Sequence, residues 1–301
     1  MTVRGAGRLV LDAPAKVNLY LHVLGRRRDG YHRLDSLVVF LDLADTLAAT
    51  VSDRLSLRLR GPWAAPLRAQ ARGDTSVERA ARRLAAEAGI RPGARLELVK
   101  RIPVAAGLGG GSADAAAALR LLDRLWDTRA GADDLARLAL RLGADVPVCL
   151  AGRSTIVRGI GERLLPGPDV SEADMVLVNP RRELATARVF AALAPRPRPG
   201  ARPLPEIEDV TQLARLLARR RNDLTLPAAA LEPAIPDMLA RLAIAGARLA
   251  RMSGSGATCY ALFDEEKSAR TAHASILAAC PAWWSAVARI RRSRPKIRVD
   301  G

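Results

Sequence analysis

The stretch Pro103–Ala113, with the sequence PVAAGLGGGSA, combines residue types that suit the binding of an anion. Its four glycines let the backbone turn with positive φ and let a ligand approach closely. The alanine-rich run after it predicts a helix over Asp114–Trp126, with Ser112 as the N-cap. Because the first N–H groups of a helix lack partners within it and carry partial positive charge, the stretch predicts a phosphate site. A flexible turn between a strand and a helix is the alternative interpretation.

The predicted phosphate-binding loop consists of Pro103, Val104, Ala105, Ala106, Gly107, Leu108, Gly109, Gly110, Gly111, Ser112 and Ala113. The loop lacks the Gly-Lys-Ser/Thr ending of a P-loop. Gly107, Gly109 and Ser112 give the pattern G-x-G-x-x-S, which differs from the dinucleotide-binding fingerprint G-x-G-x-x-G. A nucleotide bound here would therefore be held by a different fold.

The apolar segment 144–152 (ADVPVCLAG) contains a single carboxylate, Asp145, and predicts a buried turn and strand. A carboxylate within hydrogen-bond reach of an alcohol can accept its proton, so Asp145 is a candidate general base. Such a base must be ionised at neutral pH, and a nearby cation keeps it so. The alternative is that Asp145 caps local backbone donors.

Lysine is rare in this chain, since only four lysines occur among the 48 basic residues. One of them, Lys16, stands at the start of an apolar strand, where its ammonium can orient Asp145 and stabilise a developing alkoxide. Asn18 follows two residues later on the same strand face and can hydrogen-bond a substrate or Asp145. A surface lysine at a strand start and a structural asparagine are the alternatives.

The composition limits the class of protein. The 301 residues suffice for two ordinary domains or one large one, and 49% hydrophobic residues argue against global disorder. No apolar run approaches the roughly 18 residues of a membrane span, and no signal-peptide core opens the chain. We therefore expect a cytoplasmic enzyme without a membrane partner. The three cysteines, Cys149, Cys259 and Cys280, fit neither a disulfide framework nor a zinc site.

The net charge of +17 is typical of proteins that bind nucleic acid. Two observations weigh against that function here. The charge is spread along the chain, and only three Phe and three Tyr are available for base stacking. We expect no nucleic-acid partner, and an RNA-binding protein is kept as the alternative from another class.

Hydrophobic periodicity predicts a mixture of strands and helices that is typical of an α+β fold. Strands are predicted over Gly7–Leu11, Val17–Leu24, Leu34–Leu43, Thr46–Val51, Leu55–Arg60, Arg95–Val99, Ser154–Val157, Met175–Val178, Ala247–Met252, Ala257–Phe263 and Ala286–Arg291. Helices are predicted over Thr75–Ala88, Asp114–Trp126, Ala132–Leu142, Thr186–Leu193, Val210–Arg220, Ile235–Ala245 and Glu265–Ala279. Pro195–Pro205 is expected to be an exposed loop, and the basic tail Arg292–Gly301 is expected to be loosely held.

Three motifs, PAKVNL at Pro14–Leu19, PVAAGLGGGS at Pro103–Ser112 and SGSGA at Ser253–Ala257, together resemble the GHMP kinases. RDGYHRL at Arg28–Leu34 and GADVP at Gly143–Pro147 look like the branch of that family that phosphorylates a CDP-linked methylerythritol. The resemblance runs from about residue 10 to about residue 265. It implies ATP-dependent phosphorylation of the 2-hydroxyl of this substrate, giving the 2-phosphate and ADP, in non-mevalonate isoprenoid precursor biosynthesis. The nearest alternative is a GHMP kinase of the homoserine or mevalonate type.

The resemblance also implies a two-domain α+β fold. Residues 1–160 would form an α/β domain related to a ribosomal-protein fold, and residues 161–301 a ferredoxin-like domain. It implies that Mg²⁺ binds together with ATP. Since no second acidic motif is present, we expect no cage of metal ligands from the protein. Apart from small-molecule substrates, we expect a monomer or a weak homodimer.

The family's site residues map onto this chain motif by motif. The glycine-rich loop would hold the ATP phosphates, with Lys16 and Asp145 facing the γ-phosphate from the acceptor side. Tyr31 and His32 would bind the cytidine. The Tyr31 ring would stack on the base, and the His32 imidazole would hydrogen-bond its polar edge. Phe190 would stack on the opposite face of the base. A loop that covers apolar surface is the alternative for Tyr31 and His32.

The turn made of Ser253, Gly254, Ser255 and Gly256 would lie against the glycine-rich loop and the substrate phosphates. A tight hairpin without contact to a ligand is the alternative interpretation of this turn. The chain departs from the family pattern at Ala105 and Ala106, and again at Ala113, where a serine is frequent. Neither departure adds bulk that would block a phosphate, but Ala113 removes a hydroxyl.

Overall fold

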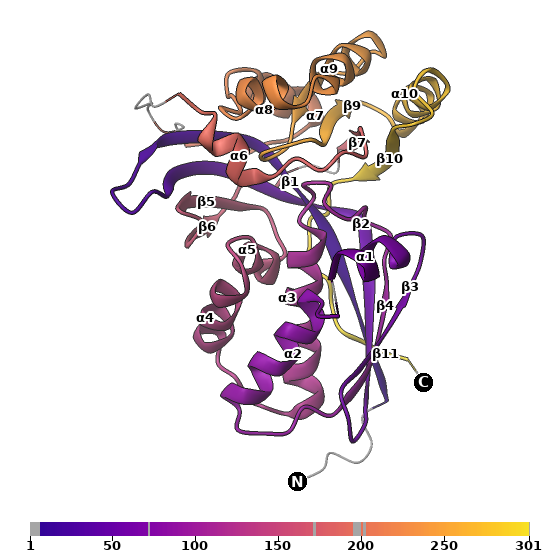
Figure 1. Ribbon diagram of the computed structural model, residues 1–301. Coiled ribbons are helices and arrows are strands. Elements are labelled where there is room, and N and C mark those ends of the chain that lie inside the picture. The colour runs from indigo at the N-terminus through magenta and orange to yellow at the C-terminus, as the bar shows by residue number, and fades with distance from the viewer. Residues whose placement is uncertain (1–6, 72, 171–172, 195–199, 201–202, 301) are drawn as a thin grey trace.

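The computed structural model describes residues 7–71, 73–170, 173–194, 200 and 203–300. Two β-sheets with helices packed against them form the molecule, and the long strands β1 and β2 extend from one half to the other (Figure 1). Most of the loop predicted over Pro195–Pro205, at 195–199 and 201–202, lies outside the described residues. The mixture of strands and helices is the α+β class that the sequence predicts.

The larger sheet has the strand order β11-β1-β2-β4-β3, and β5 and β6 extend it beside the other end of β2. Its strands are β1 (Arg8–Arg26), β2 (His32–Val51), β3 (Ser56–Arg60), β4 (Ala94–Val99), β5 (Thr155–Gly159), β6 (Arg163–Pro166) and β11 (Arg298–Asp300). β3 and β4 are parallel, whereas the other neighbouring strands are antiparallel.

The prediction of four separate strands over residues 7–51 is wrong, because β1 and β2 are each continuous. Their pairing contains register shifts between Pro14 and Lys16 and between Asn18 and Tyr20. A β-bulge lets Pro14, which has no N–H to donate, lie inside a continuous strand. Such bulges re-aim side chains, and here they flank the two polar residues that the sequence analysis selected.

Helices cover one face of the larger sheet. They are α2 (Ser76–Glu87), α3 (Gly110–Trp126), α4 (Ala132–Leu142) and α5 (Val146–Ala151). Helix α2 begins with a capping box, in which the Thr75 hydroxyl accepts from the N–H of Glu78 and the Glu78 carboxylate accepts from the N–H of Thr75. The buried alanines 115–118 make α3 narrow on the side that packs into the core with β1 and β2.

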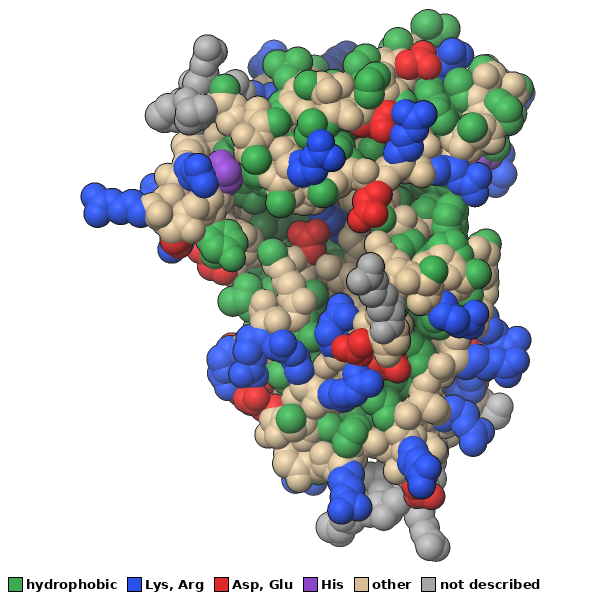
Figure 2. All heavy atoms as spheres, viewed as in Figure 1, with side chains coloured by type: hydrophobic (Ala, Val, Ile, Leu, Met, Phe, Trp, Pro, Cys, Tyr) green, Lys and Arg blue, Asp and Glu red, His purple; other side chains and the backbone are tan. Residues whose placement is uncertain are grey.

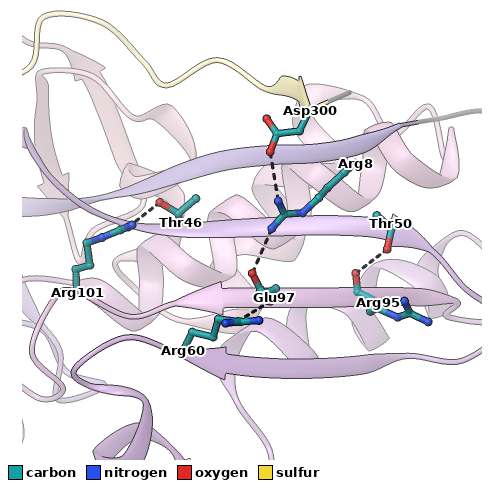
Figure 3. A network of polar contacts seen from close by, with 8 residues as sticks. All are labelled: Arg8, Thr46, Thr50, Arg60, Arg95, Glu97, Arg101 and Asp300. Carbon is teal, nitrogen blue, oxygen red and sulfur yellow. Dashed lines mark hydrogen bonds and ion pairs between the residues drawn. The ribbon is translucent and has the colours of Figure 1, made fainter.

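The opposite face of this sheet carries long charged side chains (Figure 3). A guanidinium nitrogen of Arg8 lies 3.4 Å from an Asp300 carboxylate oxygen on β11, and another lies 3.2 Å from Glu97 on β4. Arg60 of β3 lies 2.8 Å from the same Glu97. Exposed pairs of this kind contribute about 0–1 kcal/mol each. Together they connect strands that are far apart in the sequence.

The expectation of a loosely held C-terminal tail is wrong for the described part of that tail. Residues 298–300 pair with β1 as an added strand, and Pro295 is buried. The carbonyl oxygen of Pro295 accepts a hydrogen bond of 2.8 Å from Arg120 on α3. Composition alone misses this, because a basic segment can form a sheet edge when acidic partners such as Asp12 lie opposite, 3.0 Å from Arg298.

The second sheet has four antiparallel strands in the order β10-β7-β9-β8. They are β7 (Asp174–Asn179), β8 (Leu249–Met252), β9 (Cys259–Phe263) and β10 (Trp284–Arg289). Alternate residues of β7 serve its two faces. Met175 and Leu177 pack towards β1 and β2 together with α7 (Val210–Ala218), whereas Val176 and Val178 pack towards α9 (Ala234–Ile244) and α10 (Glu266–Ala279).

The remaining helices are α1 (Ala64–Ala71), α6 (Thr186–Ala191) and α8 (Thr225–Leu231). The sequence analysis missed α1 because this helix buries no residue and has no periodic apolar face. Within the described ranges, none of the helices combines the length and the apolar character that crossing a membrane requires. The division of the chain into domains at residue 160 stays a prediction.

Candidate active site

A cavity of about 1450 Å³ lies between the two halves of the molecule. Figure 2 shows this region as a hollow with charged side chains in it. Its wall comes from β1, β2, α3, α5, α6 and the loop between β4 and α3. All the predicted site residues contribute to that wall except Ala113, Ser253 and Gly256. The structure therefore gathers into one cavity residues that are up to 239 positions apart (Lys16 to Ser255).

The glycine-rich loop is packed too tightly for side chains at two positions. Gly107 has φ +76°, and a Cβ there would lie 2.3 Å from the carbonyl oxygen of Gly256. Gly109 has φ +67°, and a Cβ there would lie 2.6 Å from Cγ of Lys16. The backbone N–H of Lys16 also donates to the carbonyl oxygen of Leu108 at 2.9 Å. Glycine at these positions thus lets the loop touch both the second half of the chain and the candidate cation.

Ser112 is not the N-cap of α3, contrary to the prediction, because the helix begins two residues earlier at Gly110. Gly109 takes the cap position in a left-handed conformation that glycine adopts without strain. The first hydrogen bond of the helix runs from the N–H of Ala113 to the carbonyl oxygen of Gly109 at 2.8 Å. The N–H groups of Gly110, Gly111 and Ser112 therefore lack partners within the helix, and these three residues line the cavity. This arrangement suits a phosphate.

The candidate base and its cation are in contact. Nζ of Lys16 lies 3.1 Å from Oδ2 of Asp145, and it donates a hydrogen bond of 2.9 Å to Oδ1 of Asn18. The Lys16 side chain is only 8% exposed, whereas that of Asp145 is 50% exposed. The carboxylate is thus reachable from the cavity, while the ammonium behind it is held by the protein.

Asp145 is positioned by a helix that the sequence analysis did not predict. The segment expected to be a turn and a strand is α5, with Asp145 at its N-cap position and Pro147 in its first turn. Gly152 ends the helix in a left-handed conformation. The segment is apolar throughout because α5 packs into the core, so it shows no helical periodicity.

Asn18 is fixed by hydrogen bonds on both sides. Its side-chain amide donates to the Ser36 hydroxyl at 2.8 Å, and its backbone N–H donates to the Ser253 hydroxyl at 3.0 Å. Ser253 is completely buried. It therefore lies behind the cavity wall and holds β1 in place, and its predicted contact with a substrate stays a prediction.

The turn 253–256 brings the second sheet against the glycine-rich loop, as the resemblance implied. Gly254 and Ser255 line the cavity, and the Ser255 hydroxyl lies 2.8 Å from that of Thr186 on α6. A Cβ on Gly254 would approach Oδ1 of Asn18 to 3.1 Å. The Asn222 side-chain amide donates to the carbonyl oxygen of Gly254 at 2.8 Å, which holds the turn in place.

The hairpin between β1 and β2 carries Tyr31 and His32, and α6 carries Phe190, the third residue predicted to bind the cytidine. The rings of His32 and Phe190 are stacked, with centroids 5.0 Å apart and planes 27° from parallel. Tyr31 is 62% exposed. Partial burial, and then the charge of Arg26, lower the pKa of His32, so its imidazole is neutral at neutral pH. The prediction that Tyr31 and Phe190 enclose the base stays untested, since Phe190 here contacts His32 instead.

Two family models match the chain. That of the GHMP kinases N terminal domain matches residues 75–153, and that of the GHMP kinases C terminal domain matches residues 203–282. The chain belongs to the GHMP kinase family. The matched segments of this GHMP kinase include the glycine-rich loop, Asp145 and the turn 253–256.

Two relatives extend the match over nearly the whole GHMP kinase chain. The 4-diphosphocytidyl-2-C-methyl-D-erythritol kinase of Paramagnetospirillum magneticum is 51% identical over 282 residues, which are 93% of this chain and 98% of the relative. The kinase of the same name from Rhodospirillum rubrum is 50% identical over 291 residues, which are 95% of this chain and 93% of the relative.

Solved structures confirm the two-domain GHMP kinase fold. A crystal structure of 4-(cytidine 5'-diphospho)-2C-methyl-D-erythritol kinase matches with a TM-score of 0.74 and 36% identity, covering 93% of this chain and 98% of that one. A homoserine kinase from Cytophaga hutchinsonii matches with a TM-score of 0.70, covering 99% of both chains. Its identity of 19% shows a common fold alone.

Parts of the cavity wall escaped the sequence analysis. Leu67 and Gln70 come from α1, and Ser76 and Arg79 come from the first turn of α2. Gly111 lies close to Ser76, since a Cβ on this glycine would be 3.8 Å from the serine hydroxyl. The two helices therefore begin side by side. The sequence spacing of these residues does not distinguish them from solvent-exposed residues, so their place in the cavity wall could not be predicted.

The sequence analysis assigned no role to Lys100, although the scarcity of lysine in the chain could have selected this residue. Lys100 is 2% exposed and forms ion pairs with two buried carboxylates, Asp45 and Asp114. Burial alone would lower the pKa of Lys100, but the two carboxylates outweigh it and raise this pKa. Burial raises the pKa of Asp114 to about 7, against the opposing effect of Lys100.

The titration of Asp114 predicts a pH-dependent effect of Asp114→Asn on stability. The folded state holds a proton on Asp114 up to about pH 7, whereas an unfolded aspartate releases it near pH 4. Wild-type stability therefore falls as pH rises through this window, and the variant lacks that loss. Urea unfolding at several pH values should show the variant gaining up to a few kcal/mol relative to wild type. A difference that stays constant with pH would contradict this.

Proposed function

We propose that this GHMP kinase transfers the γ-phosphate of ATP to the 2-hydroxyl of 4-(cytidine 5'-diphospho)-2-C-methyl-D-erythritol. The observation that carries the proposal is the Lys16–Asp145 pair, which opens onto the same cavity as the free N–H groups of α3. The names of the relatives, at about half identity over more than nine-tenths of the chain, support the choice of substrate.

On the acceptor side, Asp145 accepts the proton of the 2-hydroxyl as the oxygen attacks the γ-phosphorus. A new bond forms between this oxygen and phosphorus, and the bond from phosphorus to the β-phosphate oxygen breaks, which releases ADP. The ammonium of Lys16, 3.1 Å from the carboxylate, orients Asp145 and stabilises the developing charge.

On the donor side, the N–H groups of Gly110, Gly111 and Ser112 bind the phosphates, aided by the partial positive charge of the α3 N-terminus. Arg79 on α2 also lines the cavity and adds charge there. The loop Pro103–Gly109 packs around the nucleotide through its backbone. Ala113 is buried and is not part of the cavity wall, so it is not among the phosphate contacts proposed here.

Mg²⁺ fits this site as a companion of the nucleotide. Across the described residues, no three His, Cys, Asp or Glu side chains are grouped so that they could hold a metal ion. Mg²⁺ is usually bound by substrate phosphates and water with few protein ligands, and the Ser112 hydroxyl is placed to be one. When bound, the ion neutralises charge on the phosphates.

Phe190→Ala is expected to weaken binding of the cytidine end alone. The substitution removes the ring that is stacked on His32, so the imidazole loses its fixed orientation towards the base. If losing the oriented imidazole costs as much as losing a base-stacking aromatic, about 1–3 kcal/mol, the KM for the CDP-linked substrate should rise about tenfold. Steady-state kinetics with each substrate varied would check this. A rise in the KM for ATP alone would contradict the assignment.

A substrate panel tests the proposed function. The protein is incubated with ATP and, separately, the CDP-linked methylerythritol, homoserine and mevalonate, and products are followed by ³¹P NMR. We expect a phosphomonoester and equimolar ADP with the CDP-linked substrate. Phosphorylation of homoserine or mevalonate, with none of the CDP-linked substrate, would overturn the proposal.

A further inference from the structure

The cluster of Lys100, Asp45 and Asp114, called the Lys100 cluster below, lies directly beneath the phosphate-binding loop. All three residues are at most 2% exposed. Nζ of Lys100 donates to Oδ2 of Asp45 and, at 2.8 Å, to Oδ2 of Asp114. No step of the proposed reaction uses these groups, so their burial calls for another explanation.

The Lys100 cluster connects the segments before and after the glycine-rich loop. Lys100 follows β4 and precedes the loop, while Asp114 is in the second turn of α3, after the loop. Oδ1 of Asp45 also accepts hydrogen bonds from the N–H groups of Arg101 and Ile102, at 2.6 and 2.9 Å. The chain entering the loop, the chain leaving it and β2 are thus held at one point.

The ammonium of Lys100 lies against the first residue of α3. A Cβ on Gly110 would lie 2.8 Å from Nζ of Lys100 and 3.2 Å from Cγ2 of Ile102. Gly110 is therefore constrained by the cluster below it as well as by its place in the loop. A shift of the ammonium would move Gly110, which lines the cavity and whose N–H has no partner within the helix.

The cluster carries more negative than positive charge when all three groups are ionised. Oδ1 of Asp114 is buried and has no hydrogen-bond partner among the described residues. A buried, partly unsatisfied ionic group is costly and gains little stability over apolar packing. Its position under the loop points to a role in geometry rather than in stability.

We propose that Lys100, through its contacts with Asp45 and Asp114, is a positioning residue that fixes the first turn of α3 for binding of the nucleotide phosphates. The inference rests on the proposed function, because it assigns the phosphates to that turn. Lys100 also lines the cavity, but it is only 2% exposed and two carboxylates hold its ammonium, so it acts through the backbone of Gly110 and its neighbours.

Two variants that differ from each other only at Lys100 separate this role from simple stabilisation. Asp114→Asn keeps an oxygen that can accept from Lys100. The double variant K100M/D114N has the same formal cluster charge as wild type, because one positive and one negative group are both neutralised. Comparing the two tests the loss of the ammonium, and comparing the double variant with wild type tests it at unchanged formal charge. Ile276→Ala, in the core between α10 and the second sheet, is the control for general destabilisation.

We expect K100M/D114N to raise the KM for ATP about 10- to 100-fold relative to D114N, because misplacing binding groups by about 1 Å has effects of this size. The KM for the CDP-linked substrate, whose predicted cytidine contacts lie on the β1–β2 hairpin and on α6, should stay close to that of D114N. Ile276→Ala should lower the melting temperature without changing either KM. A folded K100M/D114N with the KM for ATP of D114N, or with both KM values raised alike, would overturn the proposal.

If K100M/D114N does not fold, Asp114→Ala tests the positioning role instead. This variant removes the contact between α3 and Lys100, while Lys100 still pairs with Asp45. Asp114→Ala should weaken ATP binding, and Asp114→Asn should restore it. Equal ATP affinity of these two variants would refute the positioning role. Calorimetric titration of the wild type with ATP is measured first. A wild type that binds no ATP refutes the proposed function itself, which is a separate result.

Discussion

Asp145→Asn is expected to lower kcat by about 10²- to 10⁴-fold, the usual contribution of a general base. The amide has nearly the shape of the carboxylate, but it cannot accept the proton of the substrate hydroxyl. Because half of the Asp145 side chain is exposed and it caps no backbone group of α5, the fold should persist. Rapid-quench measurement of product formation would give the loss in the chemical step.

ATP should still bind to Asp145→Asn with an affinity near that of wild type, since the phosphate-binding N–H groups of α3 are untouched. Asp133→Asn, an exposed aspartate in the first turn of α4, is the matched control and should keep full activity. Near-normal turnover of Asp145→Asn would show that another group takes the proton.

Lys16→Met is expected to lower kcat about 10²- to 10³-fold, the size of effect seen when one group that stabilises transition-state charge is removed. Methionine keeps the length of the chain that packs against Gly109. The substitution removes the cation that pairs with Asp145 and that donates to Asn18. It should also raise the KM for ATP, which distinguishes it from the replacement of Asp145.

Lys267→Met on the exposed side of α10 is the control for the loss of one lysine. The double variant K16M/D145N should be little slower than the slower single variant, because the pair acts as a unit. Rate losses that multiply in the double variant would mean that Lys16 and Asp145 act independently.

The site's polar residues could be predicted from the sequence, but not the elements that hold them. The composition of the glycine-rich loop indicates a phosphate site, and the scarcity of lysine in the chain identifies Lys16 as a candidate. Helix α5 was missed because a buried helix is apolar all round and shows no period. The start of α3 was placed four residues late, at Asp114 instead of Gly110, because glycine, a poor helix former, occupies the first helical positions.

Long-range contacts explain the other differences. The bulges at Pro14 and beyond Asn18 arise from the pairing of β1 with β2. No pattern in the local sequence predicts that pairing. The positions of Ser253 and Gly256 behind the wall depend on packing between segments more than 140 residues apart, such as Gly107 against Gly256. Lys100 could be noticed by its rarity, but its two partners, Asp45 and Asp114, come from separate elements.

The most direct test of the central claim is a structure of the protein with a non-hydrolysable ATP analogue and the CDP-linked methylerythritol bound together. We expect the terminal phosphate to contact the N–H groups at the start of α3 and to face Lys16. The 2-hydroxyl should lie about 2.6–3.2 Å from a carboxylate oxygen of Asp145. A 2-hydroxyl held away from Asp145, or a nucleotide bound outside the glycine-rich loop, would contradict the account.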